Sequence, residues 1–151
     1  MTEGVRNCER QPKGQMKKIS EGLWQVGILF DEEGLPEEAD TVFWMIDNTG
    51  SVAGSLIFVR YPIPDNDQGL DDEVFLCLWG LVQALANRKV VAVCQAGENR
   101  SGLVATMILI ARGEKVEDAI ATVQKNGNAR THKHSFWNPG FVAQVRRLLG
   151  S

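Results

Sequence analysis

The sequence is poor in the residues that mark several large classes of protein. It has three cysteines, Cys8, Cys77 and Cys94, and none of them forms a C-x-x-C pair. An odd, widely spaced set does not suggest a disulfide framework, so we expect free thiols in a reducing compartment, the cytoplasm. The two histidines, His132 and His134, lie in the polar stretch RTHKHS, where we expect a solvated loop rather than a metal site.

An excess of positive charge and long apolar runs are also lacking. The chain of 151 residues has a formal net charge of −3, so it has no general basic field for nucleic acid or for an anionic membrane. It has no apolar run of about 18 residues, so we expect no membrane-spanning helix. The first residues have no apolar core of a signal peptide and predict a flexible N-terminal arm, 1–18. We expect residues 19–151 to form one domain and to act as a monomer.

Apolar residues make up 44% of the chain, and their spacing predicts both strands and helices. Short apolar runs bounded by turn residues predict strands at 22–29, 41–47, 55–61 and 89–93. Helical spacing predicts helices at 71–88, 101–113, 115–127 and 138–150, with a short one after Pro36. Asp71 or Asp72 can cap the first long helix, and Asn138 the last, with Pro139 in its first turn. This order predicts an α/β fold, a single mixed sheet of four or five strands flanked by helices.

The segment CQAGENRS, residues 94–101, lies between a predicted strand and a predicted helix, where ligands bind in open α/β sheets. Gly97 allows a positive φ, so that the backbone N–H groups around it can form a concave nest. The N-terminus of the helix and the planar guanidinium of Arg100 attract an anion to the same place. The positive potential of the helix N-terminus and of Arg100 is expected to keep Cys94 largely as a thiolate. The predicted phosphate-binding residues are Gln95, Ala96, Gly97, Glu98, Asn99 and Arg100. The competing interpretation of Cys94 is an inert core thiol.

The C-x5-R-S signature, with a strand before it and a helix after it, resembles the cysteine-dependent protein tyrosine phosphatase superfamily. The segment VCQAGENRSG is most similar to the dual-specificity phosphatases, whose loops often read C-x-x-G-x-x-R-S-G. The similarity extends from about residue 20 to residue 148 and includes GLWQVG, YPIPD and NPGFVAQV. It implies a protein tyrosine phosphatase-like fold and a phosphomonoester hydrolase that needs neither metal nor cofactor. The substrate it implies is a phosphorylated protein or a small phosphate ester.

The resemblance also implies a role for each residue of the site. Cys94 attacks phosphorus and forms a cysteinyl-phosphate intermediate, Arg100 and the loop amides hold the phosphoryl oxygens, and Ser101 steadies the thiolate. The general acid that protonates the leaving oxygen lies in the YPIPD segment, which makes Asp65 the candidate. Asp67 and Asp71 are rivals because the same loop is rich in acidic residues, and a turn or cap carboxylate is the structural alternative.

Two residues depart from the family pattern. Val93 stands where the family usually has a histidine, which favours a second hypothesis, a phosphate-binding pseudophosphatase module with little catalysis. Glu98 lies where the lipid phosphatases of the superfamily often carry lysine, which argues against phosphoinositides. We expect Glu98 to point outward and to pair with a nearby Arg or Lys. A third hypothesis keeps the chemistry but changes the substrate to a phosphoinositide, a phosphorylated carbohydrate or an RNA 5′-phosphate.

Other residues near these motifs have more ordinary interpretations. Cys77 is expected in the core, on the apolar face of its helix. Phe136 and Trp137 precede the last helix and form either a hydrophobic staple or the edge of a pocket. Asn99 can hold the shape of the loop by bonds from its side chain to the backbone. A disulfide between Cys8 and Cys94 that protects the nucleophile is a further alternative.

Overall fold

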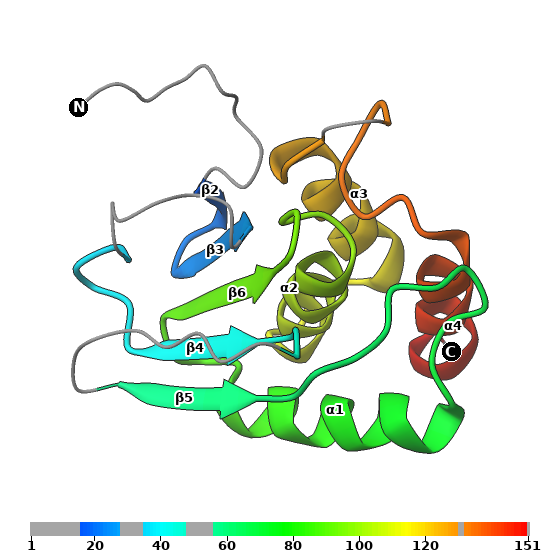
Figure 1. Cartoon of the computed structure of the whole chain (residues 1–151), viewed down its shortest axis with the longest axis horizontal. Helices are drawn as coiled ribbons and strands as arrows, with labels where there is room; N and C mark the ends of the chain where they lie inside the picture. Colours follow the sequence, from blue (N-terminus) through cyan, green and yellow to red (C-terminus); the bar gives the residue numbers. More distant parts are fainter. Residues whose placement is uncertain (1–15, 28–34, 48–55, 130–131, 151) are drawn as a thin grey trace.

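The computed structural model describes residues 16–27, 35–47, 56–129 and 132–150. Its strands are β2 (Lys17–Ser20), β3 (Leu23–Gly27), β4 (Thr41–Trp44), β5 (Ile57–Arg60) and β6 (Val90–Cys94). Its helices are α1 (Asp72–Leu85), α2 (Arg100–Ala111), α3 (Val116–Asn126) and α4 (Pro139–Leu149). They form one sheet in the order β2-β3-β6-β4-β5, with β2 antiparallel to β3 and the other neighbours parallel (Figure 1). The predicted α/β fold with a single mixed sheet is confirmed.

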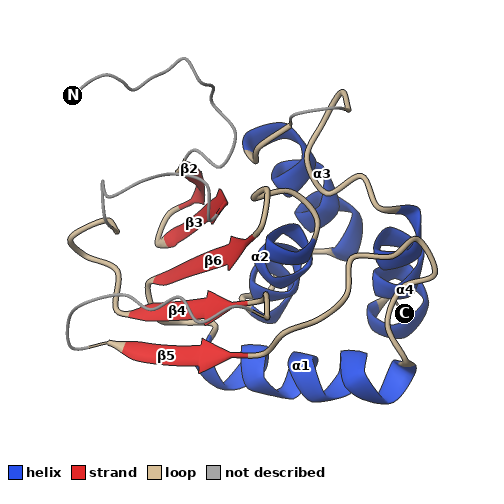
Figure 2. Ribbon diagram, in the orientation of Figure 1, coloured by secondary structure: helices blue, strands red, loops and turns tan. Residues whose placement is uncertain are grey.

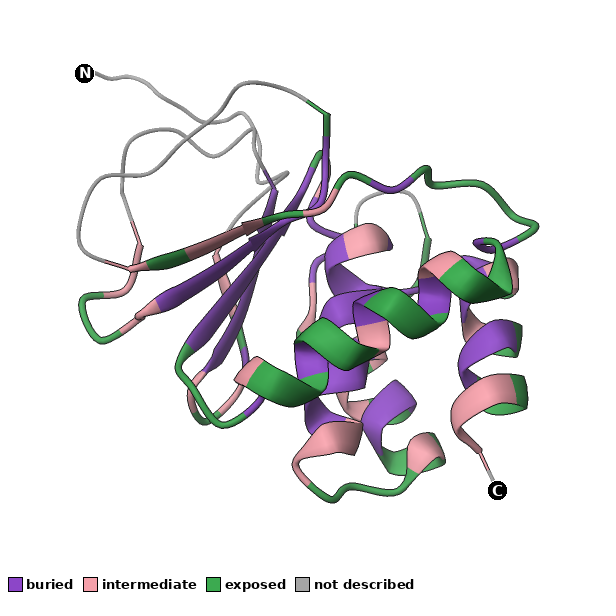
Figure 3. Cartoon of the chain, turned by 90° about the horizontal axis from the view of Figure 1, so that it is seen from below, coloured by how far each residue is buried: buried purple, intermediate pink, exposed green. Residues whose placement is uncertain are grey.

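The strands in the middle of the sheet are buried and rigidly packed, and Cys94 is at the end of one of them. Every residue of β4 and β6 is buried, as expected for apolar strands in the interior of a parallel sheet. The four helices lie on one side of the sheet (Figure 3). Within this layer α2 packs against β3, β6 and the other three helices, and its residues 101–109 are all buried. The chain therefore delivers Cys94 from the central strand and Arg100 from the central helix.

The structure differs from the predicted elements in a few places. Strand β2 was missed because its sequence KKIS has no apolar alternation, and its pairing with β3 comes from backbone hydrogen bonds of an edge hairpin. Its first residues, Lys17 and Lys18, belong to the predicted N-terminal arm, most of which lies outside the described residues. The expected helix after Pro36 is wrong, since only a turn forms there, with Ala39 N donating to Pro36 O at 3.0 Å. No helix in the described ranges is long and apolar enough to cross a membrane.

Helix α1 corrects two further expectations. It buries Phe75, Leu78 and Val82, but Cys77 is exposed, so its expected place in the core is wrong. The buried stripe is narrow because α1 packs with one face only, against α2. At the start of α1, the side chain of Asp71 makes no capping bond. The predicted cap and first turn of α4 are confirmed, because Asn138 accepts from two backbone N–H groups of that helix and Pro139 follows it.

Candidate active site

Cys94 is the last residue of β6, and its sulfur faces the first turn of α2. The Sγ atom lies 3.2 Å from Oγ of Ser101, within hydrogen-bonding distance. Cys94 is 2% exposed and Ser101 is fully buried. Cys94 is a free thiol, while Cys8 lies outside the described residues. In the structure the thiol of Cys94 donates to the hydroxyl oxygen of Ser101, so the two side chains are in direct contact.

Gly97 sets the shape of the loop between β6 and α2. Its φ is +75°, in the left-handed region where side chains are strained. A Cβ at this position would lie 2.7 Å from Gly27 N and 2.8 Å from Nδ2 of Asn128. The loop is thus pressed against the end of β3, whose Gly27 pairs with Cys94 in the sheet. Only glycine adopts this φ without strain and has no Cβ to collide with these atoms.

Several N–H groups of the loop and of Arg100 have no acceptor among the residues that the structure describes. Within the described part of the chain, no acceptor takes a hydrogen bond from the backbone N–H of Gln95, Ala96, Gly97 or Asn99. Nε of Arg100 is buried and also has no partner there, while its Nη1 donates to Ile63 O at 3.5 Å. Buried donors are almost always paired in folded proteins. Unused donors at a helix N-terminus are therefore the arrangement expected of an anion site.

A buried amide in β3 supports the loop from below. Gln25 is fully buried, and its Nε2 donates to Glu98 O at 3.1 Å. Its Oε1 accepts from Asn128 N at 2.9 Å, and Oγ of Ser135 lies 3.4 Å from the same Glu98 carbonyl. Sequence reasoning missed Gln25, although a lone amide inside an apolar strand was a signal. The network fixes the loop backbone independently of any ligand.

Glu98 lies inside the protein rather than pointing outward. It is 5% exposed, and its Oε1 accepts from Nε1 of Trp137 at 3.4 Å. The Trp137 ring stacks on His132, with centroids 3.7 Å apart and planes at 13°. The expected outward orientation is therefore wrong, because the carboxylate is buried beside an indole donor. Of the two interpretations of Trp137, this contact matches a position at the edge of the site.

Val93 lies in an apolar environment inside the sheet. It is 2% exposed and pairs in the sheet with Val26 on one side and with Trp44 on the other. The residue before the cysteine therefore contributes packing and places no ring nitrogen under the loop.

Asp65 is the acidic residue that the fold brings to the loop. It is exposed, its Oδ1 accepts from Nδ2 of Asn138 at 2.7 Å, and its Oδ2 lies 3.4 Å from Nδ2 of Asn99. Its rivals have other contacts: Oδ1 of Asp67 accepts from Gln68, and Asp71 begins α1. The geometry thus favours Asp65 over both rivals as the acid beside the loop.

The segment that carries Asp65 is held in place by α4. Figure 2 shows the connection between β5 and α1 passing beside this helix. Gln144 clamps it, because Oε1 accepts from Leu70 N at 2.9 Å and Nε2 donates to Leu70 O at 2.6 Å. Arg147 and Gln144 also bond Asp72, which lowers the pKa of that carboxyl to about 2. The stability from this contact is present above the ordinary pKa of 3.8 and is lost as the pH falls towards about 2.

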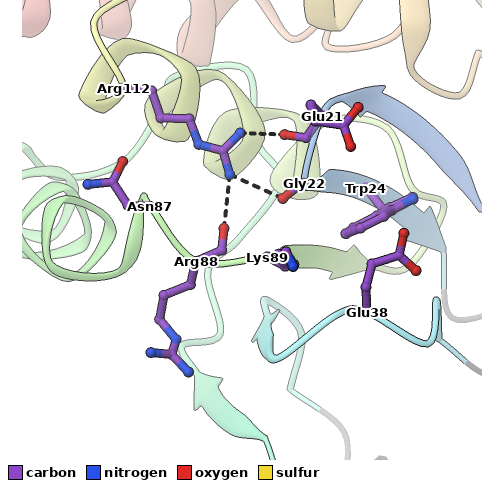
Figure 4. Close-up of a pocket in the computed structure, with 8 residues that line it drawn as sticks. All are labelled: Glu21, Gly22, Trp24, Glu38, Asn87, Arg88, Lys89 and Arg112. Atoms are coloured by element: carbon purple, nitrogen blue, oxygen red, sulfur yellow. Dashed lines mark hydrogen bonds between the residues drawn. The ribbon is translucent and has the colours of Figure 1, made fainter.

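A cavity of about 350 Å³ lies at the opposite end of the sheet (Figure 4). Its lining residues are Glu21, Gly22, Trp24, Glu38, Asn87, Arg88, Lys89 and Arg112. It lies where β6 begins and α2 ends, whereas Cys94 and Arg100 lie at the other ends of these elements. The guanidinium of Arg112 donates there to four backbone carbonyls, those of Glu21, Gly22, Ala86 and Arg88. This arrangement commits the guanidinium of Arg112 to backbone carbonyls, which stabilises the fold.

Replacing Arg112 with lysine is expected to lower the free energy of unfolding by about 2–3 kcal/mol, because an ammonium has only three N–H groups and cannot bond all four carbonyls. Urea unfolding measures the change. The activity of the folded protein should stay within about twofold of the parent, since Arg112 lies at the far end of α2. Unchanged stability would contradict this role.

Comparisons with protein-family models and with curated protein sequences find no match for this chain. Solved structures do resemble it over most of its length. Human DUSP28 has a TM-score of 0.66 at 21% identity, with 87% of this chain and 90% of that chain covered. A mouse putative dual specificity phosphatase, complexed with zinc tungstate, gives 0.65 at 18% identity, with 95% and 91% covered. The Orf virus tyrosine phosphatase OH1 gives 0.63 at 14% identity, with 90% and 87% covered. The chain therefore has the fold of the dual-specificity phosphatases.

Proposed function

We propose that the protein is a phosphomonoester hydrolase of the protein tyrosine and dual-specificity phosphatase type, acting through a cysteinyl-phosphate intermediate. The observation that carries this proposal is the convergence of three groups on one loop. Cys94 ends the central strand, Arg100 begins the central helix, and Asp65 reaches the loop through Asn99. A nucleophile, a cation and an acid beside a loop with backbone N–H groups that have no acceptor in the described part of the protein are the parts that phosphoryl transfer needs.

The proposed reaction proceeds in two displacements. The Cys94 thiolate attacks phosphorus, the bond to the ester oxygen breaks, and Asp65 gives that oxygen its proton. Asp65 then accepts a proton from water, which attacks phosphorus, breaks the P–S bond and releases inorganic phosphate. Arg100 and the amides of residues 95–100 hold the phosphoryl oxygens in both steps. Ser101 donates to the sulfur, which makes the thiolate a better leaving group.

Hydrolysis of para-nitrophenyl phosphate in the presence of a metal chelator tests this proposal. We expect turnover, because every group in the mechanism is a side chain or a backbone amide. Phosphate release that requires an added metal, or no release at all, would contradict the proposed activity.

Replacing Asp65 with asparagine, which keeps its shape, should lower kcat selectively for poor leaving groups. We expect a loss of about 100-fold or more for phenyl phosphate, whose phenolate needs a proton to leave. For para-nitrophenyl phosphate, whose phenolate leaves unaided, the loss should be under about 10-fold. Asp67→Asn, in the same acidic loop, is the matched control. If kcat fell equally for both substrates, or fell more in the Asp67 variant, Asp65 would not be the general acid.

The alternative is a phosphate-binding module with little catalysis, and the apolar environment of Val93 favours it. Titration with tungstate separates the two possibilities. If the protein binds tungstate but releases no burst of phenol from phenyl phosphate, the phosphate-binding module is supported. A burst equal to the number of sites would exclude it.

The physiological substrate is also part of the proposal. We propose a phosphorylated protein acted on by a monomer in the cytoplasm, where the free thiols of Cys77 and Cys94 would stay reduced. The buried carboxylate of Glu98 argues against highly charged phosphoinositide headgroups. The Orf virus neighbour is described as having triple substrate specificity. A panel of phosphopeptides, phosphoinositides, phosphorylated carbohydrates and RNA 5′-phosphates is therefore the experiment that ranks the classes.

A further inference from the structure

We propose that Asn138 is a positioning residue that holds the carboxyl group of Asp65 over the phosphate loop, an inference that rests on the proposed phosphatase function. Asp65, Asn99 and Asn138 form a closed ring of hydrogen bonds. Nδ2 of Asn138 donates to Oδ1 of Asp65 at 2.7 Å, and Nδ2 of Asn99 donates to Oδ2 of Asp65 at 3.4 Å. The backbone N–H of Asn138 closes the ring by donating to Oδ1 of Asn99 at 2.9 Å.

The orientation of the Asn138 amide is fixed by the helix that it caps. Its Oδ1 accepts from Gly140 N at 2.9 Å and from Phe141 N at 3.2 Å. Since these helix donors require an oxygen, the NH2 group must face the other way, towards Asp65. There it also donates to Asn66 O at 2.9 Å. With Asn138 only 2% exposed, the group has little freedom to turn.

Asp65 needs such a support because of where it lies. Residues 64–68 are all exposed, and an exposed side chain in a loop samples several rotamers. An acid that transfers a proton must lie within hydrogen-bonding reach of the leaving oxygen, and a small misplacement costs rate. The amide of Asn138 ties the exposed carboxyl group to a buried cap on a helix.

The two oxygens of Asp65 are held unequally, and this points to different roles. Oδ1 makes the short bond to Asn138, 2.7 Å, and Oδ2 makes the long one to Asn99, 3.4 Å. The oxygen with the shorter hydrogen bond is the one held more firmly in place. Oδ1 is therefore the anchor, and Oδ2, which contacts Asn99 of the phosphate loop, is the less firmly held oxygen and the one placed for proton transfer.

The variant Asn138→Ser tests this role, because serine is also a good N-cap but is too short to reach Asp65. We expect kcat for phenyl phosphate to fall by about 10-fold to 30-fold, with KM unchanged, since Asn138 does not touch the phosphoryl group. For para-nitrophenyl phosphate, kcat should change by less than about twofold. In an Asp65→Asn background, Asn138→Ser should cause no further loss, because it acts through the Asp65 carboxyl group.

Two further variants separate positioning from general destabilisation. Val145→Ala weakens the packing of a fully buried residue of α4 without touching Asp65, so it should lower the unfolding temperature and leave the leaving-group dependence unchanged. Asn138→Asp keeps an oxygen for the cap and removes the donor, so it replaces Asn138→Ser if that protein does not fold. Its kcat should show the same selective loss for phenyl phosphate.

The possible outcomes distinguish this proposal from the proposed function. If the parent protein hydrolyses both esters but Asn138→Ser loses equally on both, or loses further in the Asp65→Asn background, Asn138 is only structural and the positioning role is overturned. If the parent protein shows no turnover, the proposed function fails and the positioning role falls with it. A selective loss that vanishes in the Asp65→Asn background establishes the role.

Discussion

Replacing Cys94 with serine is expected to lower the turnover of aryl phosphates by at least about 1000-fold. The hydroxyl of serine is far less acidic than a thiol and is not ionised by a helix N-terminus and an arginine. The serine hydroxyl would take the place of the Cys94 sulfur at the end of β6. That sulfur lies 3.2 Å from Oγ of Ser101. The chemical step is thus removed while the site keeps its shape.

The same variant should keep its affinity for an oxyanion. The loop amides and Arg100, not the sulfur, are the expected donors to a bound tungstate ion. Tungstate should therefore raise the unfolding temperature of Cys94→Ser about as much as that of the parent protein. Cys77→Ser is the matched control, because Cys77 is an exposed free thiol on α1 and its loss should leave turnover unchanged. Robust turnover in Cys94→Ser would contradict the assignment of the nucleophile.

Replacing Arg100 with lysine should lower kcat/KM by about 100-fold to 1000-fold. A lysine keeps the positive charge, but it lacks the planar fork that bonds two phosphoryl oxygens at once. The Nε atom of Arg100 is buried and has no partner in the described part of the protein, so it is available to the transferring group. A point charge cannot replace that donor geometry.

The control for Arg100→Lys is Arg146→Lys, an arginine to lysine change on the exposed face of α4, where Arg146 pairs with Glu117. Its kcat/KM should match the parent within about twofold. Steady-state kinetics with para-nitrophenyl phosphate compares the two variants. If Arg100→Lys were as active as Arg146→Lys, the guanidinium would have no part in transition-state binding.

The sequence predicted the main elements because their signals are local. An apolar run gave β6, helical spacing gave the four long helices, and Asn138 with Pro139 marked the start of α4. The position of Cys94 at a strand-to-helix junction followed directly from the predicted strand β6 and the predicted helix α2. Strand β2 carries no comparable local pattern, because it is an edge strand defined by pairing.

The contacts around the site could not be read from the sequence, because they join residues far apart in the chain. Gln25 supports the carbonyl of Glu98 from 73 residues away, and Asn138 reaches Asp65 across 73 residues. The burial of Glu98 depends on Trp137, which a local pattern does not connect with the loop. Cys77 was misplaced because apolar spacing on a helix does not say how wide a stripe its neighbours cover.

The covalent intermediate is the central claim, and trapping it is the most direct test. The parent protein is mixed with an aryl phosphate labelled on phosphorus, quenched on the time scale of one turnover, and digested into peptides. The account predicts one labelled phosphoryl group per chain, on the peptide that contains Cys94, formed at least as fast as turnover and absent from Cys94→Ser. Turnover without a protein-bound label, or a label on any other residue, would contradict it.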